Sequence, residues 1–169
     1  MVTGRTISLR PYDRTHLSRT REWVNDPEIS ALLGRALPVS DVEHERWYAE
    51  LEAREDRVFF AIETNTDGRH VGNVWLWDIE WRHRKGELRI VIGEPSSLGR
   101  GFGTEAIALL CSYTFERLNL HKVYAYVLGS NQRALRAFEK AGFAVEGVLK
   151  EDRWDGTQYT DVYLLGRLK

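Results

Sequence analysis

Two glycine-marked segments in the C-terminal half constrain the fold of this chain more than any other feature. The first, LGRGFGTEA, runs from Leu98 to Ala106, and the second, NQRALRAFEKAGF, runs from Asn131 to Phe143. In the first, glycines lead into a predicted helix start, where backbone N–H groups and the helix dipole favour an anion. The second begins with an Asn that can cap a helix and contains a Gly that can stop one. Taken alone, a glycine pair before a helix more often marks a tight turn than a phosphate site.

Hydrophobic periodicity and turn residues predict the order of the remaining elements. Capping signals at Asp13 or Thr15 and at Ser40 with Glu43 predict where the first long helices begin. Strands are predicted over 5–10, 57–63, 70–81, 87–92, 122–128, 143–153 and 159–167, and helices over 13–25, 28–33 (a short piece), 41–54, 103–118 and 131–141. A Rossmann fold would need regular β-α alternation and an early Gly-x-Gly-x-x-Gly, and the chain has neither. The order predicts an α+β fold: a mixed, mostly antiparallel sheet of about seven strands flanked by about four helices, in one domain spanning 1–169.

Composition narrows the function classes. The 169 residues carry a net charge of −1, so the chain lacks the basic footprint that would favour nucleic acid or an anionic membrane. No segment approaches the ~20 apolar residues of a membrane span and none resembles a signal peptide, so we expect a cytoplasmic protein. The single cysteine, Cys111, lies in an apolar helical pattern and is expected in the core. The five histidines do not form metal-ligand spacing with cysteine or carboxylate, so no metal is predicted.

The tryptophans are the main aromatic signal. Trp75, Trp77 and Trp81 share the parity of one predicted strand and should lie on one sheet face. Core packing is the simplest interpretation, and an aromatic wall of an acceptor pocket or a dimer surface is the alternative.

The combined pattern resembles the GNAT acetyltransferase superfamily, which uses acetyl-coenzyme A. The resemblance is carried by the order strand, Gly-x-Gly, helix, strand, Asn-x-x-Ala-x-x-x-aromatic-Glu-Lys-x-Gly-Phe, and it extends from about Ile7 to Leu168. The segments LRP at 9–11, WVNDP at 23–27 and GN at 72–73 resemble the branch that holds ribosomal-protein N-acetyltransferases and spermidine-type acetyltransferases. The element order of this family is the one predicted above.

The resemblance implies a set of cosubstrate contacts. The coenzyme A pyrophosphate would lie over the glycine turn, held by backbone N–H groups of Gly99, Arg100, Gly101, Phe102, Gly103 and Thr104, with added charge from the Arg100 side chain. The family usually has Gln or Arg where this chain has Leu98, which removes a side-chain contact but leaves the backbone donors.

The strand before the turn would lie beside the pantetheine arm. It includes Ile90, Val91 and Ile92, and one of its backbone N–H groups would bind the oxyanion. Asn131 would contact the arm, cap its helix, or do both. Lys140 could touch the coenzyme or lie on a solvated helix face.

Catalytic assignments are less direct. Many relatives carry a tyrosine that protonates the leaving thiolate where this chain has Phe138, so water or another side chain would do so here. Tyr126 and Tyr159 are candidates by residue type. Glu87 opens the strand beside the proposed groove and is the first candidate for the base that deprotonates the acceptor amine, the alternative being an exposed charge near a hairpin. Glu105 matches a frequent family residue but suits a structural role in the first turn of its helix.

Two further carboxylates, Asp26 and Asp161, match positions that are often acidic in this branch, and each is an acceptor-site or a framework candidate.

We therefore predict an N-acetyltransferase in which a primary amine attacks acetyl-CoA directly in a ternary complex, because no Cys or Ser nucleophile constellation is present. A small amine or amino sugar is the first choice of acceptor, and a protein N-terminal amine is the alternative. Acidic clusters over 22–28 and 41–55 could attract a polyamine or form solvated helix faces. Phe138 also keeps open a non-catalytic acetyl-CoA binder. A P-loop module is excluded by the missing Gly-Lys-Ser/Thr. A homodimer is a family-level expectation.

Overall fold

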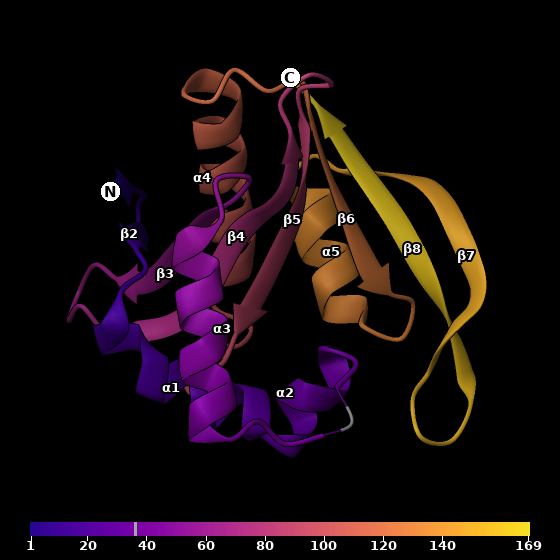
Figure 1. Ribbon diagram of the computed structural model, residues 1–169. Coiled ribbons are helices and arrows are strands. Elements are labelled where there is room, and N and C mark those ends of the chain that lie inside the picture. Colours follow the sequence, from indigo (N-terminus) through magenta and orange to yellow (C-terminus); the bar gives the residue numbers. More distant parts are fainter. Residues whose placement is uncertain (36) are drawn as a thin grey trace.

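The computed structural model describes residues 1–35 and 37–169, which form one mixed sheet with helices on both faces (Figure 1). Eight strands follow the spatial order β1-β2-β3-β4-β5-β6-β8-β7, and β5–β6 is the parallel pair among otherwise antiparallel neighbours. The strands are β1 Val2–Thr3, β2 Ile7–Pro11, β3 Val58–Thr64, β4 His70–Glu80, β5 Lys85–Ile92, β6 Lys122–Leu128, β7 Ala144–Trp154 and β8 Tyr159–Leu168. The predicted α+β class is confirmed, and the short β1 is the strand that the sequence did not reveal.

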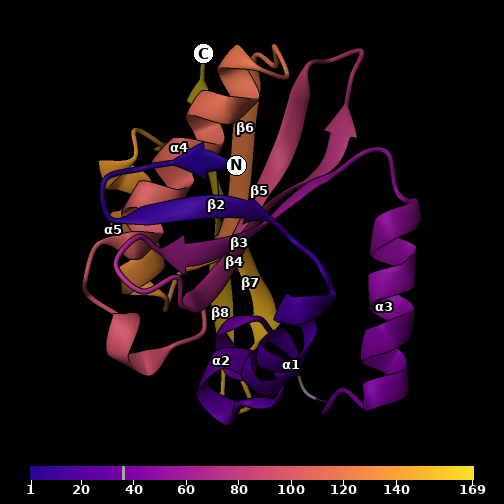
Figure 2. The same ribbon diagram turned by 90° about the vertical axis from the view of Figure 1, so that its left-hand side faces the viewer.

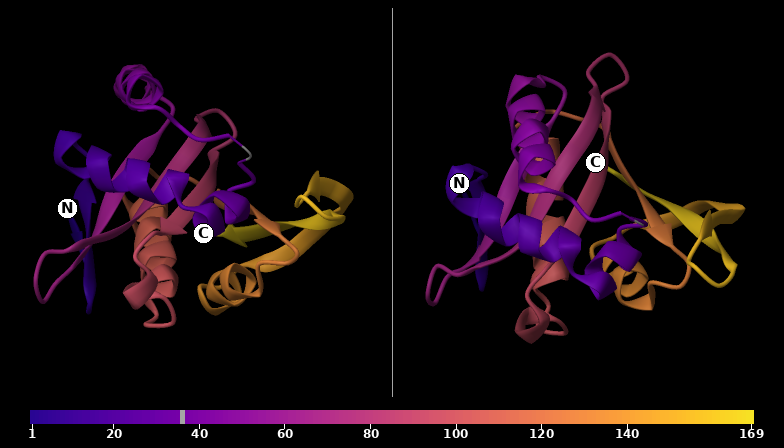
Figure 3. Two further views of the ribbon diagram at one scale, coloured as in Figure 1. Left: turned by 90° about the horizontal axis from the view of Figure 1, so that it is seen from below. Right: turned by 60° about the horizontal axis from the view of Figure 1, so that its bottom comes forward.

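The helices form two layers, one on each face of the sheet. They are the 3-10 turn η1 Arg14–His16, α1 Leu17–Asn25, α2 Pro27–Leu32, α3 Asp41–Ala53, the 3-10 turn η2 Pro95–Ser97, α4 Phe102–Glu116 and α5 Gln132–Lys140. Figures 2 and 3 show α1 and α3 on one face, with α4 and α5 on the opposite face. Within the described residues, no helix is long and apolar enough to cross a bilayer.

Side-chain caps fix where η1, α2, α3 and α5 begin, and the sequence predicted those of η1, α3 and α5. Ser40 and Glu43 form a reciprocal capping box at the start of α3, and Asp13 does the same with His16 at η1. Asp26 accepts from the backbone N–H groups of Glu28 and Ile29 and caps α2, which is a framework contact. Such caps stabilise a helix by about 1 kcal/mol each.

The main apolar core lies between the sheet and α4. Ala106, Leu110 and Cys111 of α4 are fully buried and belong to the same cluster as Ile62 and Val74 of the sheet. Burying a side chain of leucine size is worth about 1.5–3 kcal/mol, so this face supplies much of the folding energy. Burial also raises the pKa of the Cys111 thiol to about 11, which fits a core residue and not a nucleophile.

The aromatic pattern on β4 is broken by a bulge. The register with β5 shifts between Trp77 and Glu80, and Asp78 takes a left-handed conformation with φ 47°. Beyond this bulge the strand parity no longer holds, and Trp81 follows the end of β4 with 52% of its surface exposed. The prediction of one face is therefore wrong for Trp81 and holds for Trp75 and Trp77.

The parallel pair β5–β6 is joined over a short distance only. Three residue pairs connect the strands, ending at Glu87 with Tyr124, after which the strands diverge (Figure 1). In the described part of the chain, no strand pairs with the β6-facing edge of 88–92. Backbone donors and acceptors along that edge are therefore free to bind a ligand.

Candidate active site

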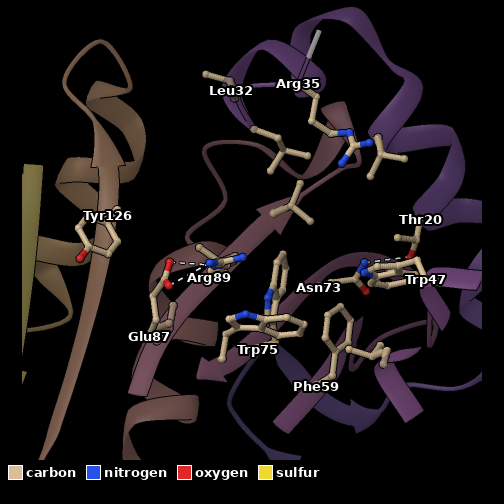
Figure 4. Close-up of a pocket in the computed structure, with 18 of the residues that line it drawn as sticks. Thr20, Leu32, Arg35, Trp47, Phe59, Asn73, Trp75, Glu87, Arg89 and Tyr126 are labelled. Atoms are coloured by element: carbon tan, nitrogen blue, oxygen red, sulfur yellow. Dashed lines mark hydrogen bonds and ion pairs between the residues drawn. The ribbon is translucent and has the colours of Figure 1, made fainter. Parts of the chain in front are cut away.

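A cavity of about 1130 Å³ passes through the opening between β5 and β6. Ile90 and Val91 of β5 line it together with Val127 and Leu128 of β6. On the α5 side the lining continues to Asn131, Ala134 and Phe138. On the α3 side it includes Trp77 and the side chains of Trp47, Phe59 and Trp75 (Figure 4). The opening thus connects the two faces of the sheet.

The glycine turn lies at the end of β5 and begins α4. Gly99 and Gly101 have φ values of 74° and 83°, in the left-handed region that favours glycine. A Cβ built on either would meet nothing within 4 Å among the described residues, whereas one on Gly103 would lie 3.8 Å from Ile92 Cγ1. The turn is therefore open to solvent and adjoins the edge of β5.

Backbone donors at this turn are available. Gly101 is the N-cap of the 15-residue α4, and the first helical hydrogen bond runs from the Glu105 N–H to the Gly101 carbonyl at 3.0 Å. The N–H groups of Phe102, Gly103 and Thr104 have no protein acceptor among the described residues. Three free donors at a helix N-terminus fit an anion such as a pyrophosphate.

Residues of α5 line the other wall of the opening. The Asn131 Oδ1 accepts from the Ala134 N–H at 3.1 Å and caps α5, while the amide Nδ2 has no protein partner in the described residues, so a second contact is compatible with the cap. Phe138 is 3% exposed and packs edge-to-face on Phe143, with the ring centroids 5.0 Å apart. Lys140 is exposed and does not line the cavity.

Glu87 lies where β5 and β6 separate, and it is only 8% exposed. Its carboxylate accepts two hydrogen bonds from Arg89, from Nε at 2.8 Å and from a terminal nitrogen at 2.9 Å (Figure 4). The alternative interpretation of Glu87 as an exposed charge is wrong. Sequence reasoning missed Arg89, although residues at i and i+2 of a strand share a face.

The two candidate tyrosines have different positions. Tyr126 lines the cavity from β6 and packs edge-to-face on Tyr124 at 6.0 Å (Figure 4). Tyr159 begins β8 at the end of a hairpin, is 62% exposed, and packs on Trp154. Within one chain, therefore, Tyr126 shares the cavity with Glu87 and Tyr159 does not line it.

A buried polar group closes the α1 side of the cavity. Asn73, which is 1% exposed, donates to the Thr20 hydroxyl at 2.9 Å and pairs with His70 Nε2 at 2.8 Å. Burial lowers the pKa of His70 to about 4, so this imidazole is neutral at pH 7. These bonds fix the Asn73 side chain against the cavity wall.

Two further acidic residues make framework contacts. Glu105 accepts from the backbone and side chain of Thr6; burial opposes its charge, but these hydrogen bonds give the carboxyl a lowered pKa overall. Asp161 accepts from the Glu151 N–H at 2.9 Å and pairs with Lys150. Among the described residues, no group of three or more His, Cys, Asp or Glu could hold a metal ion.

Comparison with known proteins agrees with this geometry. Residues 6–144 match the acetyltransferase (GNAT) domain family. A spermidine N(1)-acetyltransferase of Escherichia coli K12 is 31% identical over 94% of this chain and 84% of its own length. A probable N-acetyltransferase of Bacillus subtilis, YjcK, is 31% identical over 90% of this chain and 88% of its own.

A solved structure gives the same result in three dimensions. The Vibrio cholerae spermidine N-acetyltransferase in complex with CoA and spermine superposes with a TM-score of 0.89 at 30% identity, covering 96% of this chain and 95% of that one. The chain belongs to the GNAT acetyltransferase family, and it is an acetyl-CoA-dependent N-acetyltransferase. Among the family members it resembles are spermidine-type enzymes, one of the two groups that the sequence resembled.

Proposed function

We propose that this enzyme moves the acetyl group of acetyl-CoA directly to the primary amine of a small molecule, with a polyamine such as spermidine as the first acceptor to test. The observation that carries the proposal is a continuous cavity that passes through the β5–β6 opening and is lined by Glu87 at the point where the two strands separate. Such a cavity lets two substrates meet from opposite faces of the sheet. The relatives named for spermidine acetylation support the choice of acceptor.

On the α4–α5 side, the chain would hold the cosubstrate mainly by its backbone. Acetyl-CoA supplies the acetyl group as an activated thioester. The free N–H groups of 102–104 would bind the pyrophosphate, and the Arg100 guanidinium beside them adds positive charge. The unpaired edge of 88–92 would align the pantetheine arm, and one of its N–H groups would stabilise the charge that develops on the carbonyl oxygen. Asn131 would contact the arm through its free amide.

On the α3 side, the cavity would receive the amine. Glu87 would accept the proton that the ammonium must lose before it attacks. Trp47, Phe59 and Trp75 give apolar and aromatic surface for an alkyl chain or a cation, and Glu50 adds a carboxylate at the wall. The leaving thiolate would take its proton from water or from Tyr126, since Phe138 has no proton to give.

The proposal includes assembly into homo-oligomers. β7 is exposed along nearly all of its length and pairs with β8 on one edge, while its second edge has no strand partner within the described residues. Val145 and Trp154 lie on it at 55% and 58% exposure. One structural relative from Vibrio cholerae is described as dodecameric, which supports assembly without fixing a number of copies. The proposed setting is the cytoplasm, which the buried unpaired Cys111 fits.

The test is a CoA-release assay with acetyl-CoA against spermidine, an amino sugar, free amino acids and short peptides with free N-termini. Release with spermidine supports the proposal. Release with peptides alone would favour an N-terminal acetyltransferase, as would fit the mouse α/β-tubulin N-acetyltransferase 9, which is 28% identical over 89% of this chain and 68% of its own length. Silence across the panel, with acetyl-CoA binding confirmed by calorimetry, would favour a non-catalytic binder and overturn the proposal.

Glu87→Gln tests the proposed base. We expect kcat to fall about 100-fold or more, with the Kd for acetyl-CoA unchanged, because general-base catalysis contributes about that much. Glu80→Gln is the matched control: Glu80 is in the same β4–β5 hairpin, pairs with Lys85 at 3.0 Å, and lies outside the cavity lining. Wild-type kcat across the pH range in Glu87→Gln would contradict the base assignment.

A further inference from the structure

A row of stacked and ion-paired side chains leads from Arg54, next to the end of β4, to Glu87. Arg89 binds the Glu87 carboxylate through two nitrogens, and its guanidinium lies 5.6 Å from the centroid of the Trp77 ring. The guanidinium of Arg54 lies over the same ring at 4.0 Å. We propose that Arg89 is a positioning residue for Glu87, and that Arg54 and Trp77 hold Arg89 in place. The inference rests on the proposed function, in which Glu87 is the base.

Sheet register places these side chains together. Trp77 is the cross-strand partner of Glu87, and Trp75 is the partner of Arg89. Direct partners in an antiparallel pair project to the same face, and so do residues two apart on a strand. All four side chains therefore project to the face that carries α3, where they line the cavity.

The Arg54 end of this row is fixed by two aspartates. Arg54 donates to both carboxylate oxygens of Asp56, at 2.9 and 2.6 Å, and to Asp78 at 2.8 Å. Asp78 is the residue of the β4 bulge, and its left-handed backbone marks a local departure from regular strand geometry. The bulge thus has an identifiable effect, which is to give Arg54 a second carboxylate next to Trp77.

The contact between Arg89 and Glu87 orients the base without blocking it. A guanidinium fork fixes the plane of a carboxylate, and each carboxylate oxygen retains a second lone pair for another donor. The ion pair also raises the pKa of Arg89, first through the hydrogen bond to Glu87, so Arg89 stays charged wherever the enzyme works. Glu87 would then present a fixed lone-pair direction to the incoming amine.

Other ionisable groups lie around Tyr124, the residue of β6 that pairs with Glu87, or around Asp78. Tyr124 and Tyr126 lie on β6, Asp78 and Glu80 on β4, Lys85 on β5, and Arg54 after α3. The pKa of Tyr124 is raised, mainly by burial and then by the Glu87 charge. Arg89 is the cation in hydrogen-bond contact with the Glu87 carboxylate in the described part of the chain. Removing it takes away the cation that the Glu87 carboxylate contacts directly.

The experiment compares pH profiles of kcat for wild type, Arg89→Met and Arg89→Lys, at saturating acetyl-CoA and spermidine or the panel amine with the fastest CoA release. In Arg89→Met we expect the acidic limb to move about one pH unit higher, kcat at pH 7 to fall about tenfold or more, and the Kd for acetyl-CoA to stay unchanged. Arg89→Lys keeps the charge but not the fork, so the limb should return towards wild type while kcat recovers only in part.

Arg10→Met is the matched control. Arg10 is also a strand arginine paired to a glutamate, Glu63 at 3.1 Å, but it lies outside the cavity lining. It should keep the wild-type limb and rate. A wild-type limb in Arg89→Met would overturn the positioning role.

A double variant separates this proposal from the base assignment. If Arg89 acts through Glu87, then adding Arg89→Met to Glu87→Gln should cause little further loss of kcat. A full tenfold loss on the Glu87→Gln background would overturn the proposal while leaving the base intact. A wild-type rate in Glu87→Gln would instead show that Glu87 is not the base. If no amine of the panel causes CoA release, both the proposed function and this inference are overturned.

Discussion

The two faces of the sheet solve two binding problems with different parts of the chain. On the α4–α5 face, the proposed cosubstrate contacts come mostly from backbone: a left-handed Gly101, free N–H groups at the start of α4, and the unpaired edge of β5. On the α1–α3 face, the cavity is built from side chains such as Trp75, Glu87 and Arg89. These three come from β4 and β5, and Trp47 of α3 and Phe59 of β3 complete the wall from other parts of the chain.

This difference determines what substitution can do on each face. Backbone donors persist when most side chains change, so the absence of Gln or Arg at Leu98 leaves the donors of the glycine turn in place. Side-chain contacts change with every substitution, so an acceptor site can diverge while the cosubstrate site does not. The comparison predicts that variants on the α4–α5 face alter acetyl-CoA binding and that variants on the α1–α3 face alter acceptor use.

The largest effect expected is on the first face. Gly101→Val should weaken acetyl-CoA binding at least about 100-fold, because a β-branched residue at φ 83° is strained and its side chain would project into the space proposed for phosphate. Calorimetric titration with acetyl-CoA measures this directly. Unchanged affinity in a folded variant would break the assignment of the glycine turn as the anion site.

Gly156→Val separates strain from ligand contact. Gly156 also has a positive φ, 104°, and open space around its Cβ position, but it lies in the β7–β8 turn outside the cavity lining. In a urea titration, Gly156→Val should lose about as much folding stability as Gly101→Val. It should still bind acetyl-CoA with wild-type affinity. Equal losses of affinity in both variants would show that backbone strain alone explains the Gly101 result.

The sequence predicts the α4–α5 face better than the α1–α3 face. Caps and glycines are local signals, so the capping box of Ser40 with Glu43, the N-cap Asn131 and the glycine turn before α4 were all predictable. The order of strands and helices followed from periodicity and turn residues. The additional β1 is two residues long, too short for periodicity to register.

The acceptor face was only partly predictable, since its contacts depend on register and irregular backbone. The bulge at Asp78 shifts the parity of β4, so Trp81 leaves the face that Trp75 and Trp77 share. Predicting the contact between Arg89 and Glu87 requires knowing that Glu87 is buried where β5 and β6 separate. Tyr159 matched by residue type, but it does not line the cavity, although Arg153 and Val162 of the same hairpin do.

The second prediction tests the acceptor face. Trp75 stacks on Phe59, with ring centroids 4.9 Å apart, and forms part of the aromatic wall. Trp75→Ala should raise the KM for the acceptor about 10- to 100-fold while the Kd for acetyl-CoA stays near wild type, because a large aromatic contact is lost on one face only. Trp75→Phe should recover most of the loss, and Trp81→Ala, an exposed aromatic after β4 that lies outside the cavity lining, is the control. A parallel loss of acetyl-CoA affinity would break the separation of the two faces.

The smallest effect expected is a pH dependence of stability that arises on the acceptor face. His70 packs between Trp23 and His16, and burial lowers its pKa to about 4 from an ordinary 6.5. The unfolded chain therefore binds a proton before the folded one does, so the stability from neutral His70 is present above pH 6.5 and is lost as the pH falls towards 4. Because the ring is partly exposed, we expect a loss of about 1 to 2 kcal/mol in the free energy of unfolding. Urea titrations at pH 7 and 4.5 measure it. His70→Gln should reduce the difference in unfolding free energy between the two pH values, and His83→Gln, at an exposed histidine, should not. An unchanged difference in His70→Gln would assign the acid sensitivity to a group other than His70.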